Sequence, residues 1–141
     1  MTYDITLETE ASPDDLQVIS DGLEETVLPL FPDKSRTSVA FFLRDDSRKI
    51  VGGVNGNYGS FGWLYVNALW VADGLRGRGY GSELMRRIEA EAVKHDCRHA
   101  FLNTMSFQSP EFYKKLGWTI FAELEDFPKG HSRIFLRKRL V

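Results

Sequence analysis

Residues 69 to 88 read Leu69-Trp-Val-Ala-Asp-Gly-Leu-Arg-Gly-Arg-Gly-Tyr-Gly-Ser-Glu-Leu-Met-Arg-Arg-Ile88, the order of a buried strand, a glycine-rich turn and an amphipathic helix. The turn holds three glycines at alternate positions, Gly77, Gly79 and Gly81. Glycine loses more backbone entropy on folding than other residues, so three together predict that something approaches the main chain closely. A helix that begins at about Gly79 leaves its first N–H groups without intrahelical partners. These groups and the positive end of the helix dipole favour an anion, of which phosphate is the usual example.

The residue pattern distinguishes between three kinds of phosphate loop. A Walker loop needs Lys-Ser/Thr after its last glycine, but Ser82-Glu83 follows here. A dinucleotide loop needs G-x-G-x-x-G, and no choice of first glycine places the third one correctly. The pattern Arg/Gln-x-x-Gly-x-Gly fits from Arg76 to Gly81, with Arg78 adding charge. This stretch closely resembles the acyl-CoA pyrophosphate loop of the GNAT N-acetyltransferase superfamily; the alternative is a tight strand-to-helix turn without a ligand.

Composition places the chain among ordinary soluble globular proteins. Its 141 residues predict one domain over residues 1–141, and its formal net charge of -2 argues against a nucleic-acid partner. No apolar run approaches the roughly 20 residues of a membrane span, and the first residues do not resemble a signal peptide. Cys97 is the only cysteine, which excludes an intramolecular disulfide. We therefore expect a cytoplasmic protein that binds no membrane.

Hydrophobic periodicity and turn residues predict an alternation of strands and helices along the chain. The apolar run Trp63–Val71 predicts a central strand buried on both faces, and Leu84, Met85, Ile88 and Ala92 form the apolar stripe of the following helix. Residues 28–38 are apolar but contain prolines, which predicts a loop or a short second helix. The other expected elements are strands at Tyr3–Glu8, Val39–Arg44, Lys49–Gly56, Arg98–Thr104, Trp118–Leu124 and His131–Leu140, and helices capped by Ser12 and Ser109.

This order matches the GNAT fold over nearly the whole chain. A second motif, Phe112-Tyr113-Lys-Lys-Leu116-Gly117-Trp118, resembles the F-Y-x-K-x-G-F signature of that superfamily. The resemblance implies an α/β (α+β) acyl-CoA N-acyltransferase fold, with a mixed, mostly antiparallel central sheet of about seven strands flanked by about four helices. It implies an acetyl-CoA-dependent N-acetyltransferase that acts on a small-molecule amine, needs no metal, and forms a homodimer through its last strands.

The resemblance also implies a role for individual residues. The backbone from Gly77 to Ser82 would hold the pyrophosphate, and the pantetheine arm would pair with the end of the long strand, where that strand splays from its neighbour. A main-chain N–H near Leu69 or Trp70 would stabilise the oxyanion, and Tyr113 would protonate the departing thiolate. The implied cofactor-binding residues are Leu69, Trp70, Val71, Arg76, Gly77, Arg78, Gly79, Tyr80, Gly81, Ser82, Asn103 and Tyr113, and the implied catalytic residue is Tyr113.

The sequence assigns no general base. Many relatives place a Glu or Asp on the long strand, where this chain has Asn67, which cannot accept a proton. Asn67 is either a buried amide satisfied by the backbone or a residue of the acceptor site. The candidates for the base are His131, Glu123, Glu125, Asp126 and a chain of water molecules. The missing acid keeps open a non-catalytic acyl-CoA-binding module, and a protein or peptide N-acetyltransferase is a third possibility.

Overall fold

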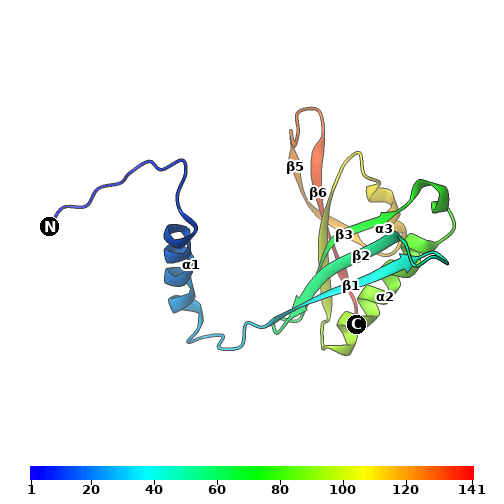
Figure 1. Cartoon of the computed structure of the whole chain (residues 1–141), viewed down its shortest axis with the longest axis horizontal. Helices are drawn as coiled ribbons and strands as arrows, with labels where there is room; N and C mark the ends of the chain where they lie inside the picture. Colours follow the sequence, from blue (N-terminus) through cyan, green and yellow to red (C-terminus); the bar gives the residue numbers. More distant parts are fainter. The chain divides into compact units, whose positions relative to one another are not determined.

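The computed structural model describes all residues from 1 to 141, and their contacts divide the chain into two units, residues 1–34 and residues 35–141. The expectation of one domain over residues 1–141 stays a prediction. No helix combines the length and the apolar content that crossing a membrane requires. The elements are α1 (Pro13–Val27), β1 (Arg36–Arg44), β2 (Ile50–Gly59), β3 (Trp63–Val71), a 3-10 turn η1 (Asp73–Leu75), α2 (Tyr80–Lys94), β4 (His99–Met105), α3 (Pro110–Lys115), β5 (Thr119–Glu125) and β6 (Ser132–Arg139) (Figure 1).

The first unit contains the helix α1. The Ser12 hydroxyl accepts a hydrogen bond from the Asp15 N–H at 3.1 Å, and Pro13 occupies the first helical position, as the sequence predicts. Glu24 forms an ion pair with Lys34. No residue of α1 is buried, so the helix depends on its cap and first-turn acids more than on packing within this unit.

For the first 38 residues the predicted strand at Tyr3–Glu8 is wrong, and of the two alternatives for the proline-containing segment the loop is confirmed. Residues 1–8 have no regular structure, although Tyr3–Glu8 alternates like a strand, because they pair with no other strand. Residues 28–35 form a turn followed by irregular chain and not a second helix. Pro29 and Pro32 remove the N–H groups that such a short helix would need.

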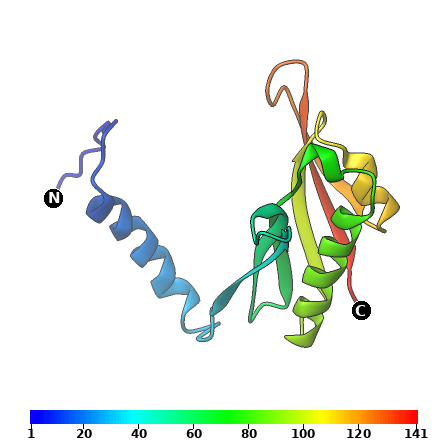
Figure 2. The ribbon, with the colours of Figure 1, turned by 45° about the vertical axis from the view of Figure 1, so that its right-hand side comes forward.

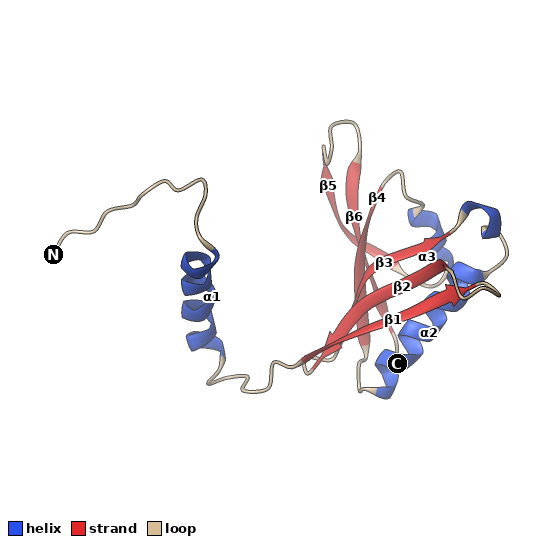
Figure 3. Cartoon of the chain, in the orientation of Figure 1, coloured by secondary structure: helices blue, strands red, loops and turns tan.

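The second unit is built on a six-stranded sheet in the order β1-β2-β3-β4-β6-β5. Every neighbouring pair is antiparallel except β3 and β4, which run parallel. The parallel pairing extends only from Trp63↔His99 to Tyr65↔Phe101. Figure 3 shows β3 and β4 side by side at one end and diverging toward the other. The mixed, mostly antiparallel sheet is confirmed, with six strands and three α-helices in place of about seven and about four.

The helix α2 covers one face of this sheet (Figure 2). Its predicted apolar stripe of Leu84, Met85, Ile88 and Ala92 is entirely buried. Alternate side chains of the strands complete the core on this face, which follows from the two-residue period of a strand. They include Val54, Tyr58, Leu64, Val66, Ala100, Leu102, Ile134 and Leu136.

The strand β3 corrects a further expectation. The sequence predicts burial on both faces, but Leu64 and Val66 are buried while Trp63 and Asn67 are exposed. The apolar run reads as continuous because large aromatic residues also occupy the face turned away from α2. Aromatic pairs lie along that face: Trp63 stacks on His99 at 4.7 Å, and Tyr65 lies 4.9 Å from Phe101.

Replacing Ile88 with alanine should lower the free energy of unfolding by about 2–5 kcal/mol, because it leaves a cavity at a fully buried position. Urea unfolding monitored by circular dichroism measures the change. Arg87→Ala is the matched control on the exposed side of the same helix turn, and its effect should stay below about 1 kcal/mol. Equal effects of the two variants would contradict the assignment of the core face.

Candidate active site

A cavity of about 770 Å³ lies where the glycine turn, the end of β3 and the start of α3 meet. It brings together residues that are more than 40 positions apart in sequence, Leu69 and Tyr113 among them. The predicted site residues that line it are Leu69, Trp70, Val71, Arg76, Gly77, Gly79, Tyr80, Gly81, Ser82 and Tyr113. Of the predicted set, only Arg78 and Asn103 are not among the lining residues.

The glycine turn has the backbone conformation that its sequence predicts. Gly77 and Gly79 have φ values of 78° and 87°, a conformation that residues with a side chain rarely adopt. A Cβ built on either residue meets no protein atom within 4 Å, so the space above the turn is open. Gly81 differs, because its built Cβ would lie 3.3 Å from Phe112 Cζ. The turn is therefore packed against α3 at Gly81 and open at Gly77 and Gly79.

The first N–H groups of α2 face this open space without a side-chain cap. Gly79 is the N-cap residue, and the first helical hydrogen bond runs from the Glu83 N–H to the Gly79 carbonyl at 3.1 Å. The N–H groups of Tyr80, Gly81 and Ser82 precede that bond and have no intrahelical acceptor. Together with the helix dipole they have the geometry that favours an anion, while binding of a phosphate there stays a prediction.

Charged side chains around the turn do not oppose an anion there. The carboxylate of Glu83 in the first turn of α2 receives hydrogen bonds from Arg86 and Arg87, which lower its pKa to about 2. Both arginines thus neutralise the nearest acid. Arg76 donates from Nε to the Val71 carbonyl at 3.0 Å and pairs with Asp73, so it braces the turn against the end of β3. Arg78 is exposed beside the turn.

The end of β3 offers main-chain groups to the gap between β3 and β4. Ala72 N–H bonds to the Val51 carbonyl at 2.9 Å, and Gly53 is paired with Trp70. Hydrogen-bonding direction alternates along an antiparallel strand, so Trp70 is turned toward β2. The N–H and C=O groups of Leu69 and Val71 therefore point the other way, into the gap that opens beyond Tyr65.

Tyr113 projects from α3 into the same cavity. It is half-buried, with its ring edge-on to Phe112 at 5.1 Å and to Trp118 at 6.4 Å. Burial raises the pKa of the Tyr113 phenol, so the hydroxyl stays protonated over a wider pH range than an exposed tyrosine. Phe112 fills the side of α3 that meets Gly81, which leaves Tyr113 facing the cavity.

Several predicted residues lie outside the cavity. Asn103 is one of them, and its side chain accepts a hydrogen bond from Arg133 at 2.9 Å. Its role in binding the cofactor stays a prediction. None of the four candidate bases lines the cavity. Among them, Glu123 accepts a hydrogen bond from Ser132 at 2.7 Å, and His131 lies edge-on to Phe107 at 5.0 Å. No group of three or more His, Cys, Asp or Glu residues is placed to hold a metal ion.

The cavity also contains residues that the predicted set lacks: Leu75, Phe107, Gln108, Ser109 and Phe112. Most of them belong to the segment that connects β4 to α3. Ser109 precedes α3, as the sequence predicts, but its side chain makes no capping hydrogen bond. Its φ of 72° also differs from the extended conformation usual for an N-cap residue. Their position in the sequence could have indicated them, because the segment that leads into the helix of Tyr113 must pass beside the same cavity.

Comparison with known proteins identifies the family. The sequence model of the acetyltransferase (GNAT) family matches residues 6–118. Acetyltransferase Atu2258 of Agrobacterium fabrum is 31% identical over 123 residues, which are 87% of this chain and 89% of that protein. Blasticidin-S acetyltransferase of Streptomyces morookaense is 38% identical over 93 residues, 65% of this chain and 68% of that protein.

Solved structures show the same fold. The crystal structure of an acetyltransferase from Bacillus cereus has a TM-score of 0.87 and 33% identity, and the match covers 95% of this chain and 97% of that one. An aminoglycoside 6'-N-acetyltransferase complexed with coenzyme A matches with a TM-score of 0.64 over 94% of this chain and 96% of its own, at 17% identity. The chain belongs to the acetyltransferase (GNAT) family and is an acyltransferase.

Proposed function

We propose that this acetyltransferase transfers the acetyl group of acetyl-CoA to a primary amine of a small molecule by direct attack in a ternary complex. The observation that carries the proposal is the single cavity shared by the glycine turn, the end of β3 and Tyr113. It offers an anion site at one end and a hydroxyl group at the other. A diphosphate with a long thiol-bearing arm is a ligand that needs both.

The N–H groups at the start of α2 would bind the pyrophosphate, and Gly77 and Gly79 would let it approach the backbone. The Leu69 and Val71 main-chain groups would pair with the amides of the pantetheine arm, as an added strand does. The Leu69 N–H is the better oxyanion donor, because the N–H of Trp70 is turned toward β2. Loss of one such donor typically costs about 3–4 kcal/mol of transition-state stabilisation.

In the chemical step the amine nitrogen would attack the thioester carbonyl, and its surplus proton would leave to water. Collapse of the tetrahedral intermediate breaks the carbon–sulfur bond. Tyr113 would then donate its proton to the departing thiolate, which gives free thiol and an amide product. The proton returns to Tyr113 from solvent before the next turnover, so no oxidant or metal is needed.

A relative named as a blasticidin-S acetyltransferase supports a small-molecule acceptor. The proposal is tested first by isothermal titration with acetyl-CoA and then by release of free thiol with a panel of amines. Micromolar binding with thiol release supports it. Absence of heat at concentrations well above micromolar would refute it.

A non-catalytic acyl-CoA-binding module is the second candidate. The observation that favours it is Asn67 on β3. Its side chain is an amide and not a carboxylate, so it cannot accept a proton from the attacking amine. Binding of acetyl-CoA without thiol release across the whole amine panel would favour this alternative. Release of thiol with any amine would exclude it.

A further inference from the structure

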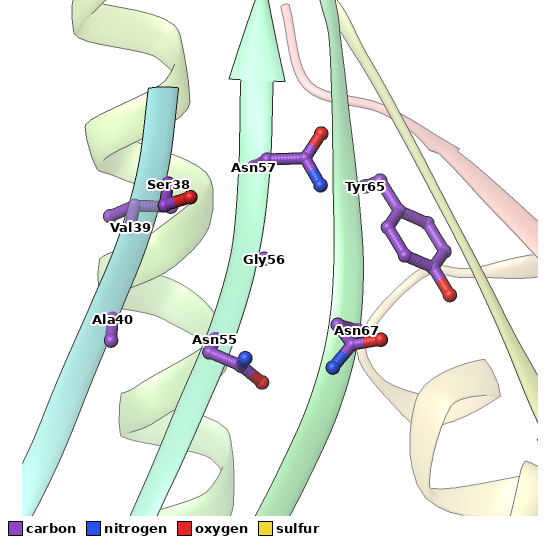
Figure 4. A pocket seen from close by; sticks show the side chains of 8 residues that line it. All are labelled: Ser38, Val39, Ala40, Asn55, Gly56, Asn57, Tyr65 and Asn67. Carbon is purple, nitrogen blue, oxygen red and sulfur yellow. The ribbon is translucent and has the colours of Figure 1, made fainter. Parts of the chain in front are cut away.

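A second hollow, of about 380 Å³, lies on the face of the sheet that α2 does not cover (Figure 4). Its polar side chains are Asn55 and Asn57 of β2, Tyr65 and Asn67 of β3, and Ser38 of β1. We call it the asparagine hollow. Figure 4 shows the amide groups of Asn55 and Asn57 directed toward β3. Three of the four asparagines of the chain gather here.

Strand register explains why these residues meet. Asn57 pairs with Tyr65 and Asn55 pairs with Ala68, so Asn67 is the extra residue of a β-bulge between β2 and β3. Bulges re-aim side chains and are common beside active sites. The bulge requires Gly56, because any Cβ there would overlap the carbonyl oxygen of Tyr65. The local backbone is thus shaped to present Asn67 beside the other two amides.

The chemistry of the hollow is that of neutral hydrogen-bonding groups. No Asp, Glu, Lys, Arg or His lines it. Within residues 35–141, the side-chain amides of Asn55, Asn57 and Asn67 have no hydrogen-bond partner. Each offers two N–H donors and a carbonyl acceptor. A ligand that presents a donor next to an acceptor matches such groups, whereas an ammonium would find no carboxylate.

The hollow also lies close to the proposed site of acetyl transfer. Asn67 precedes Leu69 by two residues on β3, which corresponds to about 7 Å along a strand. Leu69 lines the cavity that holds Tyr113. A molecule whose amine reaches the thioester would therefore place a group four or five bonds away over the asparagine hollow.

We propose that the asparagine hollow binds an uncharged amide-like group of the acceptor, such as a carboxamide, a ureide or the edge of a polar heterocycle. This inference rests on the proposed function and names its substrate class. An acceptor without such a group would cover these amides without pairing with them, and sites that bind by hydrogen bonds reject analogues that lack the partner group. Because the hollow is open on one side, the preference is expected to be about tenfold to 100-fold.

Three amines that share a four-carbon chain test the preference: γ-aminobutyramide, butylamine and 1,4-diaminobutane. The amide should have the highest kcat/KM with the wild-type protein, by at least about tenfold. Asn55→Ala and Asn57→Ala should raise KM for the amide while kcat changes little, because the lost contact is remote from the reacting atoms. Equal kcat/KM values for the three amines would overturn the inference.

A change of charge provides a sharper test. Asn67→Asp keeps the shape of the side chain but adds a carboxylate, so the preference should move toward 1,4-diaminobutane by about tenfold. The matched control is Thr37→Asp, which adds the same charge at an exposed position of β1. Thr37 lies two residues before Val39, which packs against the core, so the two share the face of the sheet opposite to the hollow. Thr37→Asp should leave the preference unchanged. Equal shifts in both variants would show a long-range charge effect and overturn the inference.

Binding is measured separately from turnover by NMR of the side-chain amide groups, with and without CoA. Titration with γ-aminobutyramide should shift the signals of Asn55, Asn57 and Asn67, while Asn103, which bonds to Arg133, stays in place. Unmoved signals from all three, or equal shifts with butylamine, would overturn the inference. Failure of acetyl-CoA to bind the same sample would instead refute the proposed function, so the two failures are distinguishable.

Discussion

Gly79→Val is expected to raise the dissociation constant of acetyl-CoA at least about 100-fold, which corresponds to about 2.7 kcal/mol of binding free energy. Gly79 has a φ of 87°, and a left-handed conformation costs a residue with a side chain roughly 1–2 kcal/mol. The turn must either carry this strain or change its conformation and redirect the N–H groups of α2. In addition, the space around a Cβ at Gly79 is empty of protein, so the valine methyl groups would occupy the volume assigned to the phosphates.

Gly74→Val is the matched control for this variant. Gly74 lies five residues earlier in η1, a built Cβ there meets no atom within 4 Å, and its φ is not positive. Isothermal titration should give wild-type affinity for Gly74→Val, and thermal unfolding should show that both variants are folded. Wild-type affinity in Gly79→Val would mean that the diphosphate does not bind at the start of α2.

The glycine turn and the helix after it are the parts of the molecule that the sequence predicts best. Their conformation depends on local causes: glycines that permit positive φ, a strand before them and the apolar stripe of Leu84, Met85, Ile88 and Ala92 after them. Predicting that Tyr113 lies in the cavity also required the resemblance to a known family. Trp70 and Tyr113 are far apart in sequence and line one cavity only in the folded chain.

Other features depend on partners that a sequence does not show. Tyr3–Glu8 has the alternation of a strand, but alternation is satisfied only when another strand pairs with it. The run Trp63–Val71 is apolar enough for burial on both faces, yet apolarity does not state which faces are covered. The asparagine hollow arises from a bulge in the register of β2 and β3, and register is a property of two strands together.

Asn67 shows how these limits bear on function. Its position on the long strand left two interpretations, a buried amide or an acceptor residue. Within residues 35–141 the side chain is exposed and has no hydrogen-bond partner, which favours the second. We propose that the asparagine hollow recognises the acceptor and that the Tyr113 cavity is the site of acetyl transfer. Residues of β3 line both.

Tyr113→Phe is expected to lower kcat for acetyl transfer by about 100-fold, the lower part of the range for loss of a general acid. The variant removes only the hydroxyl group, so packing against Phe112 and Trp118 should persist. Affinity for acetyl-CoA should stay near that of the wild type, since the proposed role begins when the thiolate departs. Tyr58→Phe is the control, because Tyr58 is buried against His95 at 4.7 Å and lies outside the cavity. An unchanged kcat in Tyr113→Phe would reduce Tyr113 to a packing residue.

The pH dependence of kcat separates the two roles of Tyr113 further. Burial raises the pKa of its phenol above the ordinary value of about 10, so the acid is protonated and competent throughout the neutral range. As the pH rises through that elevated pKa, the phenol loses its proton and kcat should fall in the wild-type protein. Tyr113→Phe has no such proton to lose, so its lower kcat should show no decline attributable to this group. Circular dichroism at each pH must show folded protein, because ionising a buried phenol also destabilises the fold above the unfolded pKa. A decline at the same pH in both proteins would assign it to unfolding or to another group, and the proton donor would have to be sought elsewhere in the cavity.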